Sequence, residues 1–203
     1  MPKVYAIDDI TPVVDPSAFV HSSAVLIGDV IVGARAYIGP CVCLRGDFGR
    51  IVVEEGANIQ DTCMLHGFPG KDTVVGAEST IGHGAVLHGC VVRRGALVGM
   101  NCVVNDNAEV GEDAVVAALA FVKAEDVIPA RSLAVGIPAK VLRTLSPQEL
   151  SWKKDNMHLY QQLAVRSAQT MREVDALTAV EPNRRRIDIP GAMPLSELKK
   201  KHA

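Results

Sequence analysis

Three histidines occur at spacings that would let them share one metal ion. The tripeptide Leu-His-Gly occurs twice, around His66 and His88, and a third histidine, His83, lies between them. Imidazole is a common zinc ligand, and three such ligands leave one position of the ion open for water or substrate. A metal in this state activates bound water and polarises a carbonyl oxygen. These residues therefore predict a catalytic metal site, with zinc favoured and iron or cobalt as alternatives.

The elements that must position these histidines follow from a six-residue period. An aliphatic residue recurs every six positions from Val14 to Leu44 and again from Val92 to Ile128. Helices repeat about every 3.6 residues and strands at every second residue, so a sustained period of six fits neither. It is typical of a parallel β-helix, in which three hexapeptides form a coil of about 18 residues. A valine-rich β-sandwich is the alternative, and it would show alternating strands separated by turns.

The composition agrees with a narrow β prism. The chain has 203 residues, 17 glycines and only 4% aromatic residues, so aliphatic side chains must fill the core. The net charge of −2 creates no basic field, and we expect no binding to nucleic acid. No apolar run approaches the roughly 20 residues of a membrane span. Five cysteines in no paired framework, and an acidic N-terminal stretch without a signal-peptide pattern, predict a cytoplasmic protein.

The period stops near residue 144, which divides the chain into three parts. We expect the β-helix over residues 1–144. Ser146-Pro147-Gln148-Glu149 has the form of a capping box with proline at the first helical position. Apolar residues then follow at helical spacing, so residues 145–180 are predicted to form a C-terminal helix that packs on the β-helix. Residues 181–203 are charged and are expected to form an extended or flexible tail.

The six-residue phase also places the histidines relative to one another. His66 and His88 are 22 residues apart, which is one coil plus a short loop, and Arg45 occupies the same phase one coil before His66. These three side chains should stack along one face at the strand spacing of about 4.8 Å. His83 lies on the preceding face and should point away from them. It could complete a three-histidine site only from a neighbouring subunit, as in a symmetric trimer.

Several motifs of the chain resemble the γ-class carbonic anhydrase superfamily. The motifs are Arg45-Gly46-Asp47, Asn58-Ile59-Gln60-Asp61, His66, and Gly82-His83 through Cys90. The resemblance implies a left-handed parallel β-helix with a C-terminal helix, assembled as a homotrimer with metal sites at its subunit interfaces.

Residue roles follow from the same resemblance. It implies that His66, His83 and His88 are the metal ligands, with His83 donated across the interface. It also implies that Gln60 lies near the metal-bound water. The positions that match the charged interface network are Arg45, Asp47 and Asp61.

A narrower resemblance concerns the segments Leu44–Val53 and Met64–Pro69. They are similar to the phenylacetic acid degradation family PaaY, of which the carnitine-operon CaiE proteins are near relatives. This implies a hydrolase, a metal-dependent CoA thioesterase of phenylacetate catabolism whose substrate is an acyl-CoA. Phe48 stands where the prototype anhydrase has a functional glutamate, and the loop after His66 is short. Both departures disfavour carbon dioxide hydration, and Phe48 would provide an apolar patch for an acyl group.

Other functions and other contacts stay open. A γ-type carbonic anhydrase is one alternative, and a hexapeptide acyltransferase or a non-catalytic trimeric scaffold is another, since fold does not fix function. Tyr160 and His158 on the predicted helix are candidate substrate contacts. Arg93 and Arg94 are candidates too, because guanidinium suits the phosphates of CoA. The competing interpretation is ordinary packing for Tyr160, solvent exposure for Arg93 and Arg94, and no role in the site for His158.

Overall fold

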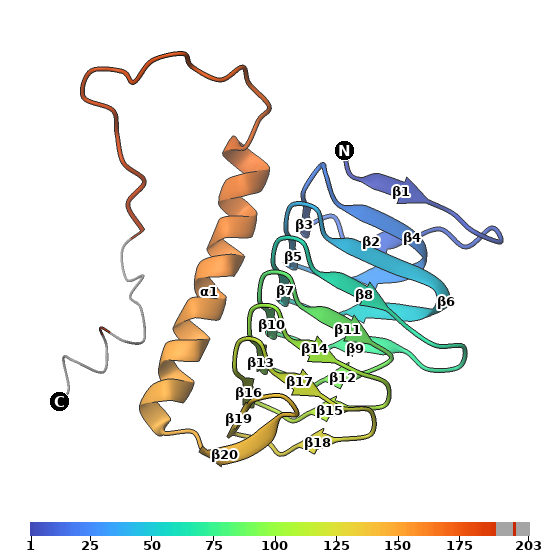
Figure 1. Ribbon diagram of the computed structural model, residues 1–203. Coiled ribbons are helices and arrows are strands. Elements are labelled where there is room, and N and C mark those ends of the chain that lie inside the picture. Colours follow the sequence, from blue (N-terminus) through green and yellow to red (C-terminus); the bar gives the residue numbers. More distant parts are fainter. Residues whose placement is uncertain (190–196, 198–203) are drawn as a thin grey trace.

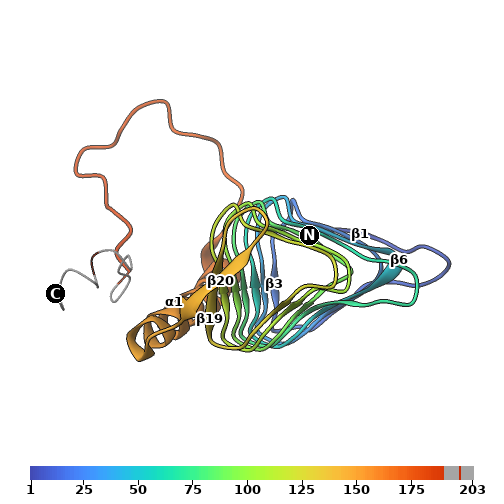
Figure 2. The ribbon, with the colours of Figure 1, turned by 60° about the horizontal axis from the view of Figure 1, so that its bottom comes forward.

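The hexapeptides form short parallel strands that stack in three columns, and each column is one face of a triangular prism (Figures 1 and 2). The computed structural model describes residues 1–189 and residue 197. The first face consists of β3 (Phe19–Val20), β5 (Tyr37–Ile38), β7 (Asn58–Ile59), β10 (Thr80–Ile81), β13 (Leu97–Val98), β16 (Val115–Val116) and β19 (Ser132–Val135). The antiparallel β20 (Lys140–Thr144) closes its end.

The other two faces are joined by two long strands. The second face contains β1 (Lys3–Tyr5), β8 (Met64–His66), β11 (Val86–His88), β14 (Val103–Val104) and β17 (Phe121–Val122). The third face contains β2 (Val13–Val14), β9 (Thr73–Val75), β12 (Val91–Val92), β15 (Glu109–Val110) and β18 (Val127–Ile128). Strands β4 (Val25–Val32) and β6 (Cys43–Val53) run through both faces. The predicted hexapeptide β-helix is therefore confirmed.

The core of the prism is a stack of aliphatic side chains at the six-residue positions. On the second face the fully buried column consists of Leu26, Leu44, Leu65, Leu87, Val104 and Val122. Burying each of these side chains stabilises the fold by about 1.5–3 kcal/mol. Because each inward residue stacks on its equivalent in the next coil, the core fixes the register of the strands and hence the positions of outward-facing residues.

One helix, α1 (Pro147–Thr170), lies along the first face and contacts β3, β5 and β7 (Figure 1). The predicted capping box is present, since the Ser146 side chain accepts from the Glu149 N–H and the Glu149 carboxylate accepts from the Ser146 N–H. Buried Met157 and Ala164 provide the apolar contact. Residues 171–189 have no regular secondary structure, and the rest of the predicted tail, apart from residue 197, lies outside the described residues.

Within the described part of the chain, no helix has the length and apolar character that crossing a membrane requires.

Candidate active site

The corner between the second and third faces projects beyond the hexapeptide outline (Figure 2). Here β6 continues through residues 47–50, and the loop of residues 67–72 connects β8 to β9. Gly49 lets these two segments touch, since a Cβ atom on it would lie 2.3 Å from the Phe68 carbonyl oxygen and 2.6 Å from that of Lys71. We call this region, residues 45–50, 66–73, 88–89 and 106, the site corner.

Two imidazoles face each other at the site corner. His66 and His88 are directly paired in the register of β8 and β11, and their Nδ1 and Nε2 atoms, respectively, lie 3.0 Å apart. The second nitrogen of each ring contacts a carboxylate: His66 Nε2 lies 2.9 Å from Asp47 Oδ1, and His88 Nδ1 lies 2.5 Å from Asp106 Oδ1. The result is a continuous line of four side chains, Asp47–His66–His88–Asp106.

Arg45 fixes the outer end of this line. Its Nη1 donates to Asp47 Oδ2 at 2.7 Å. Partial burial raises the pKa of Asp47, but hydrogen bonds from Arg45 and His66 and the charge of Arg45 act in the opposite direction, and the net pKa is below the ordinary 3.8. Asp47 is therefore an anion at neutral pH. As a hydrogen-bond acceptor it favours the form of His66 that carries a proton on Nε2.

The donor atoms fit a divalent metal ion. If each outer nitrogen donates its proton to a carboxylate, the facing nitrogens of His66 and His88 present lone pairs to each other at 3.0 Å. Such a pair is stable only around a shared proton or a cation. Tetrahedral ligands at zinc–nitrogen distances stand roughly 3.3 Å apart. Histidine ligands of metals also usually donate their other nitrogen to a carboxylate, as both do here.

Within one chain, however, the metal set is incomplete. No group of three or more histidine, cysteine, aspartate or glutamate side chains in metal-binding geometry occurs among the described residues. The third predicted ligand, His83, lies at the corner between the first and second faces, where its Nδ1 is 2.9 Å from Asp61 Oδ2. Its role as a ligand across a subunit interface remains a prediction, as does the metal itself.

Two further candidates, Gln60 and Tyr160, lie near the first face rather than beside the imidazole pair. Gln60 is buried and donates to Asn58 Oδ1 at 3.2 Å. The Tyr160 ring packs against Tyr37 at a centroid distance of 5.7 Å. Burial, followed by the charges of Tyr37 and Asp61, raises the pKa of Tyr160 to about 12, so its hydroxyl stays protonated. These side chains therefore share the neighbourhood of Asp61 and not that of His66.

Two phenylalanines flank the imidazole pair. The Phe48 ring lies 5.5 Å from the His66 ring, and the Phe68 ring lies 5.5 Å from the His88 ring in an edge-on arrangement. They are 64% and 49% exposed, respectively. Exposed aromatic rings beside a polar line of side chains give the site corner apolar walls, and a mixture of apolar and polar groups is usual in a small-molecule site.

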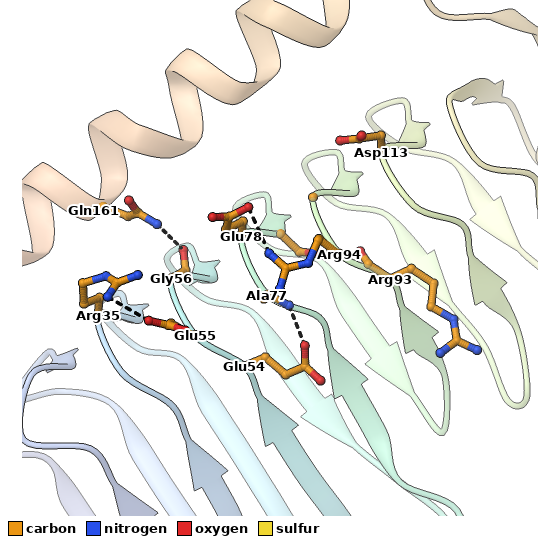
Figure 3. A network of polar contacts seen from close by, with 12 residues as sticks. Arg35, Glu54, Glu55, Gly56, Ala77, Glu78, Arg93, Arg94, Asp113 and Gln161 are labelled. Atoms are coloured by element: carbon orange, nitrogen blue, oxygen red, sulfur yellow. Dashed lines mark hydrogen bonds and ion pairs between the residues drawn. The ribbon is translucent and has the colours of Figure 1, made fainter.

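The remaining candidates lie elsewhere. His158 is exposed on α1. Arg93 pairs with both carboxylate oxygens of Glu109 at 2.9 and 2.8 Å, and Arg94 pairs with Glu78 at 3.2 Å. Figure 3 shows both arginines at the corner between the third and first faces; Arg94 points toward Glu78, and the Arg93 side chain extends away from α1. We call this region, residues 35, 54–56, 77–78, 93–95 and 113, the helix corner. The structure does not bring these arginines to the histidine pair.

Two residues of the site corner were missed from sequence. Asp106 follows His88 by 18 residues, one coil, and the same phase that aligned Arg45 with the histidines would have found it. Phe68 lies in the recognised loop after His66, but no periodic pattern specifies where a loop side chain points.

Comparisons with known proteins identify close relatives. No family model matches the chain. It is 56% identical over 183 residues to the carnitine operon protein CaiE of Salmonella newport (strain SL254), which covers 90% of this chain and 92% of the relative. The same values apply to CaiE of Salmonella heidelberg (strain SL476).

Two solved structures also superpose closely. A candidate acetyltransferase of Bacillus cereus has a TM-score of 0.81 at 30% identity, covering 83% of this chain and 99% of the other. A hexapeptide transferase family protein of Anaplasma phagocytophilum has a TM-score of 0.78 at 35% identity, covering 80% and 96%.

These names contradict the hydrolase expected from sequence. Both solved neighbours are described as transferases, so the expectation of a CoA thioesterase, which passes the acyl group to water, is wrong. The physical reason is that histidine and carboxylate motifs report how a nucleophile is activated and not which nucleophile it is. Water, an amine and a hydroxyl all need the same removal of a proton.

Proposed function

The chain belongs to the family of the carnitine operon protein CaiE, and we propose that it transfers an acyl group from a CoA thioester to a small amine or alcohol. The observation that carries the proposal is the line Asp47–His66–His88–Asp106, with an exposed phenylalanine beside each histidine. The transferase descriptions of the two solved neighbours support the same reaction class. The five unpaired cysteines support a cytoplasmic location.

The imidazole pair would act as the general base. A facing nitrogen of His66 or His88 accepts the proton of the acceptor's N–H or O–H group, and the acceptor's lone pair forms a bond to the thioester carbonyl carbon. The carbon–sulfur bond then breaks, and the same proton passes from imidazolium to the CoA thiolate. Asp47 and Asp106 stabilise the transient imidazolium and hold both rings in orientation, as the carboxylate of a catalytic triad does.

We propose a divalent metal at the same place, in a homotrimer. His66, His88 and His83 of the partner subunit would hold it, which takes up the facing nitrogens, so a metal-bound site would act by polarising the thioester carbonyl and not by imidazole base catalysis. Support for His83 comes from its contact with Asp61 at 2.9 Å, because all three histidines then share the pattern of one nitrogen held by a carboxylate. Asp61 and the carboxylates of the site corner would thus orient the ligands.

The acyl group would lie against Phe48 and Phe68. Both rings flank the histidines and both are exposed. Covering each with hydrocarbon is favourable by about 25 cal/mol for every Å² removed from water. The site should therefore accept apolar acyl groups better than small polar ones.

The test is an acyl-transfer assay with purified full-length protein. Acetyl-CoA and a longer, apolar acyl-CoA are each incubated with a panel of amines and alcohols; free thiol is followed by absorbance and the acylated product by mass spectrometry. Thiol release that requires an acceptor, and is lost in His66→Ala but kept in His158→Ala, supports the proposal. Release at the same rate without any acceptor, or none with any acceptor, contradicts it; the latter result favours a non-catalytic scaffold.

A further inference from the structure

A single buried hydroxyl group connects the backbones of the two site histidines. Thr73 begins β9, where the loop of residues 67–72 rejoins the prism, and its side chain is completely buried. Its Oγ1 donates to the carbonyl oxygen of His66 at 2.6 Å and accepts from the N–H of Gly89 at 2.9 Å. Gly89 directly follows His88 in the chain, so one oxygen atom contacts both histidine segments.

The surrounding backbone is arranged around this hydroxyl. The N–H of Gly89 also donates to the His66 carbonyl at 3.1 Å, which closes a triangle of three hydrogen bonds. Gly67 leaves space beside it, since a Cβ atom there would lie 3.2 Å from Thr73 Oγ1. Gly89 itself has φ of +56°, a conformation that a side chain would strain. Buried hydroxyl groups in folded proteins are nearly always hydrogen-bonded, and this one makes one bond as a donor and one as an acceptor.

We propose that Thr73 is a positioning residue for the imidazole pair, setting the separation of His66 and His88. The two rings meet at 3.0 Å only if the backbones that carry them keep their relative position to within a fraction of an ångström. The regular β8–β11 ladder ends at the histidines, because the chain after His66 leaves the prism into the loop. At that point the Thr73 hydroxyl adds a second connection beside the direct bond from the Gly89 N–H to the His66 carbonyl.

Two variants that differ by one oxygen atom test this inference. Thr73→Ser keeps the hydroxyl and Thr73→Ala removes it, while both lose the methyl group. Ser79→Ala is the matched control, because Ser79 is also completely buried and donates its hydroxyl to a backbone carbonyl, that of Arg93, near the helix corner. If Thr73→Ala does not fold, Thr73→Val, which keeps the shape of the side chain, replaces it.

The first measurement is NMR of full-length protein with ring-15N histidine, treated with chelator. The hydrogen-bonded ring proton shared by the pair is assigned by its loss in His88→Asn. We expect this resonance in wild type, Thr73→Ser and Ser79→Ala, and its loss or a clear shift in Thr73→Ala. An unchanged resonance in Thr73→Ala, or the same change in Thr73→Ser, overturns the inference.

The second measurement is kinetic and is the part that rests on the proposed function. In acyl transfer we expect kcat of Thr73→Ala to fall about 10- to 100-fold with KM nearly unchanged, as for other residues that orient a catalytic group. Thr73→Ser should stay within about 3-fold of wild type. If wild type transfers no acyl group to any acceptor, the proposed function fails, and the NMR result still decides the role of Thr73.

Discussion

The site corner and the helix corner of the same prism use carboxylates in opposite ways. At the helix corner three carboxylates meet a fixed cation: Arg35 pairs with Glu55 at 2.7 Å and Arg94 with Glu78 at 3.2 Å (Figure 3), and Lys153 of α1 pairs with Asp113 at 2.6 Å. At the site corner Asp47 and Asp106 meet imidazoles instead.

The partner of the carboxylate decides what the corner can do. Arginine and lysine keep their protons at neutral pH, so their pairs hold the coils and the helix together without exchanging anything. Imidazole changes its charge near neutral pH and can pass a proton on. The site corner also has the two added segments, residues 47–50 and 67–72, which place Phe48 and Phe68 beside the rings. The hexapeptide repeat thus forms both corners, and the two added segments supply the aromatic side chains beside the histidines.

The largest effect should come from removing one imidazole. We expect His88→Ala to lower kcat for acyl transfer by about 10²- to 10⁴-fold, the usual contribution of general base catalysis. Arg94→Ala at the helix corner should leave kcat within about 2-fold. The measurement is initial-rate kinetics with saturating acceptor.

Equal losses in both variants would contradict the division of roles between the corners. So would a His88→Ala protein that keeps wild-type turnover. Far-UV circular dichroism of each variant ensures that folded proteins are compared.

Substitutions at the helix corner should instead lower the free energy of unfolding and leave the rate of acyl transfer unchanged. The Lys153 side chain is only 5% exposed, and its ammonium group donates to Asp113 and to the Gly95 carbonyl. Lys153→Ala leaves both acceptors without this donor, which should lower the free energy of unfolding by about 2 kcal/mol. Urea unfolding measures it, and kcat should remain unchanged.

The neighbouring Lys154 is exposed and is the matched control. Lys154→Ala should change the free energy of unfolding by no more than about 0.5 kcal/mol. If Lys153→Ala abolished acyl transfer without loss of stability, the helix corner would be part of the active site.

Sequence predicted the prism and part of the site for one reason, the strict period of the core. Because Leu65 and Leu87 are stacked, fully buried core positions, the residues after them had to be neighbours, and His66 and His88 are. The period carries no information about the loops, so the contact of Phe68 with His88 could not be predicted. Nor could it identify the acceptor, which is why the hydrolase expectation was wrong.

Removing one of the two phenylalanine rings of the site corner should have an effect of intermediate size, on substrate binding. Because Phe68 is half exposed, Phe68→Ala should leave stability almost unchanged but raise KM for an apolar acyl-CoA by about 10-fold, the equivalent of about 1.4 kcal/mol of lost contact. KM for acetyl-CoA should change less. Leu119→Ala, at an exposed position 63% accessible on another corner, is the control and should change neither value. A uniform rise in KM for both thioesters would contradict an acyl-group contact.

The smallest expected effect is on the loss of stability in acid. It compares Asp47, which contacts a histidine and Arg45, with Glu109, which pairs with Arg93. Burial raises the pKa of Asp47, but the stronger combined effect of Arg45 and His66 lowers it below 3.8 in the folded protein. The hydrogen bonds from Arg93 lower the pKa of Glu109 below 4.5. A lowered folded pKa means that each ionised carboxylate stabilises the fold above its unfolded pKa, and that this contribution is lost as the pH falls through the folded value.

Asp47→Asn and Glu109→Gln should therefore differ from wild type most near neutral pH and converge with it in acid. The Glu109 difference should begin to fade near pH 4.5 and the Asp47 difference near pH 4, as measured by urea unfolding at half-unit steps. Because Asp47 also holds a histidine, its variant alone should lower the rate of acyl transfer at neutral pH. A constant Asp47 difference down to the lowest pH would mean that the ionised form of this carboxylate contributes no stability, and the site corner would then owe its order to the backbone alone.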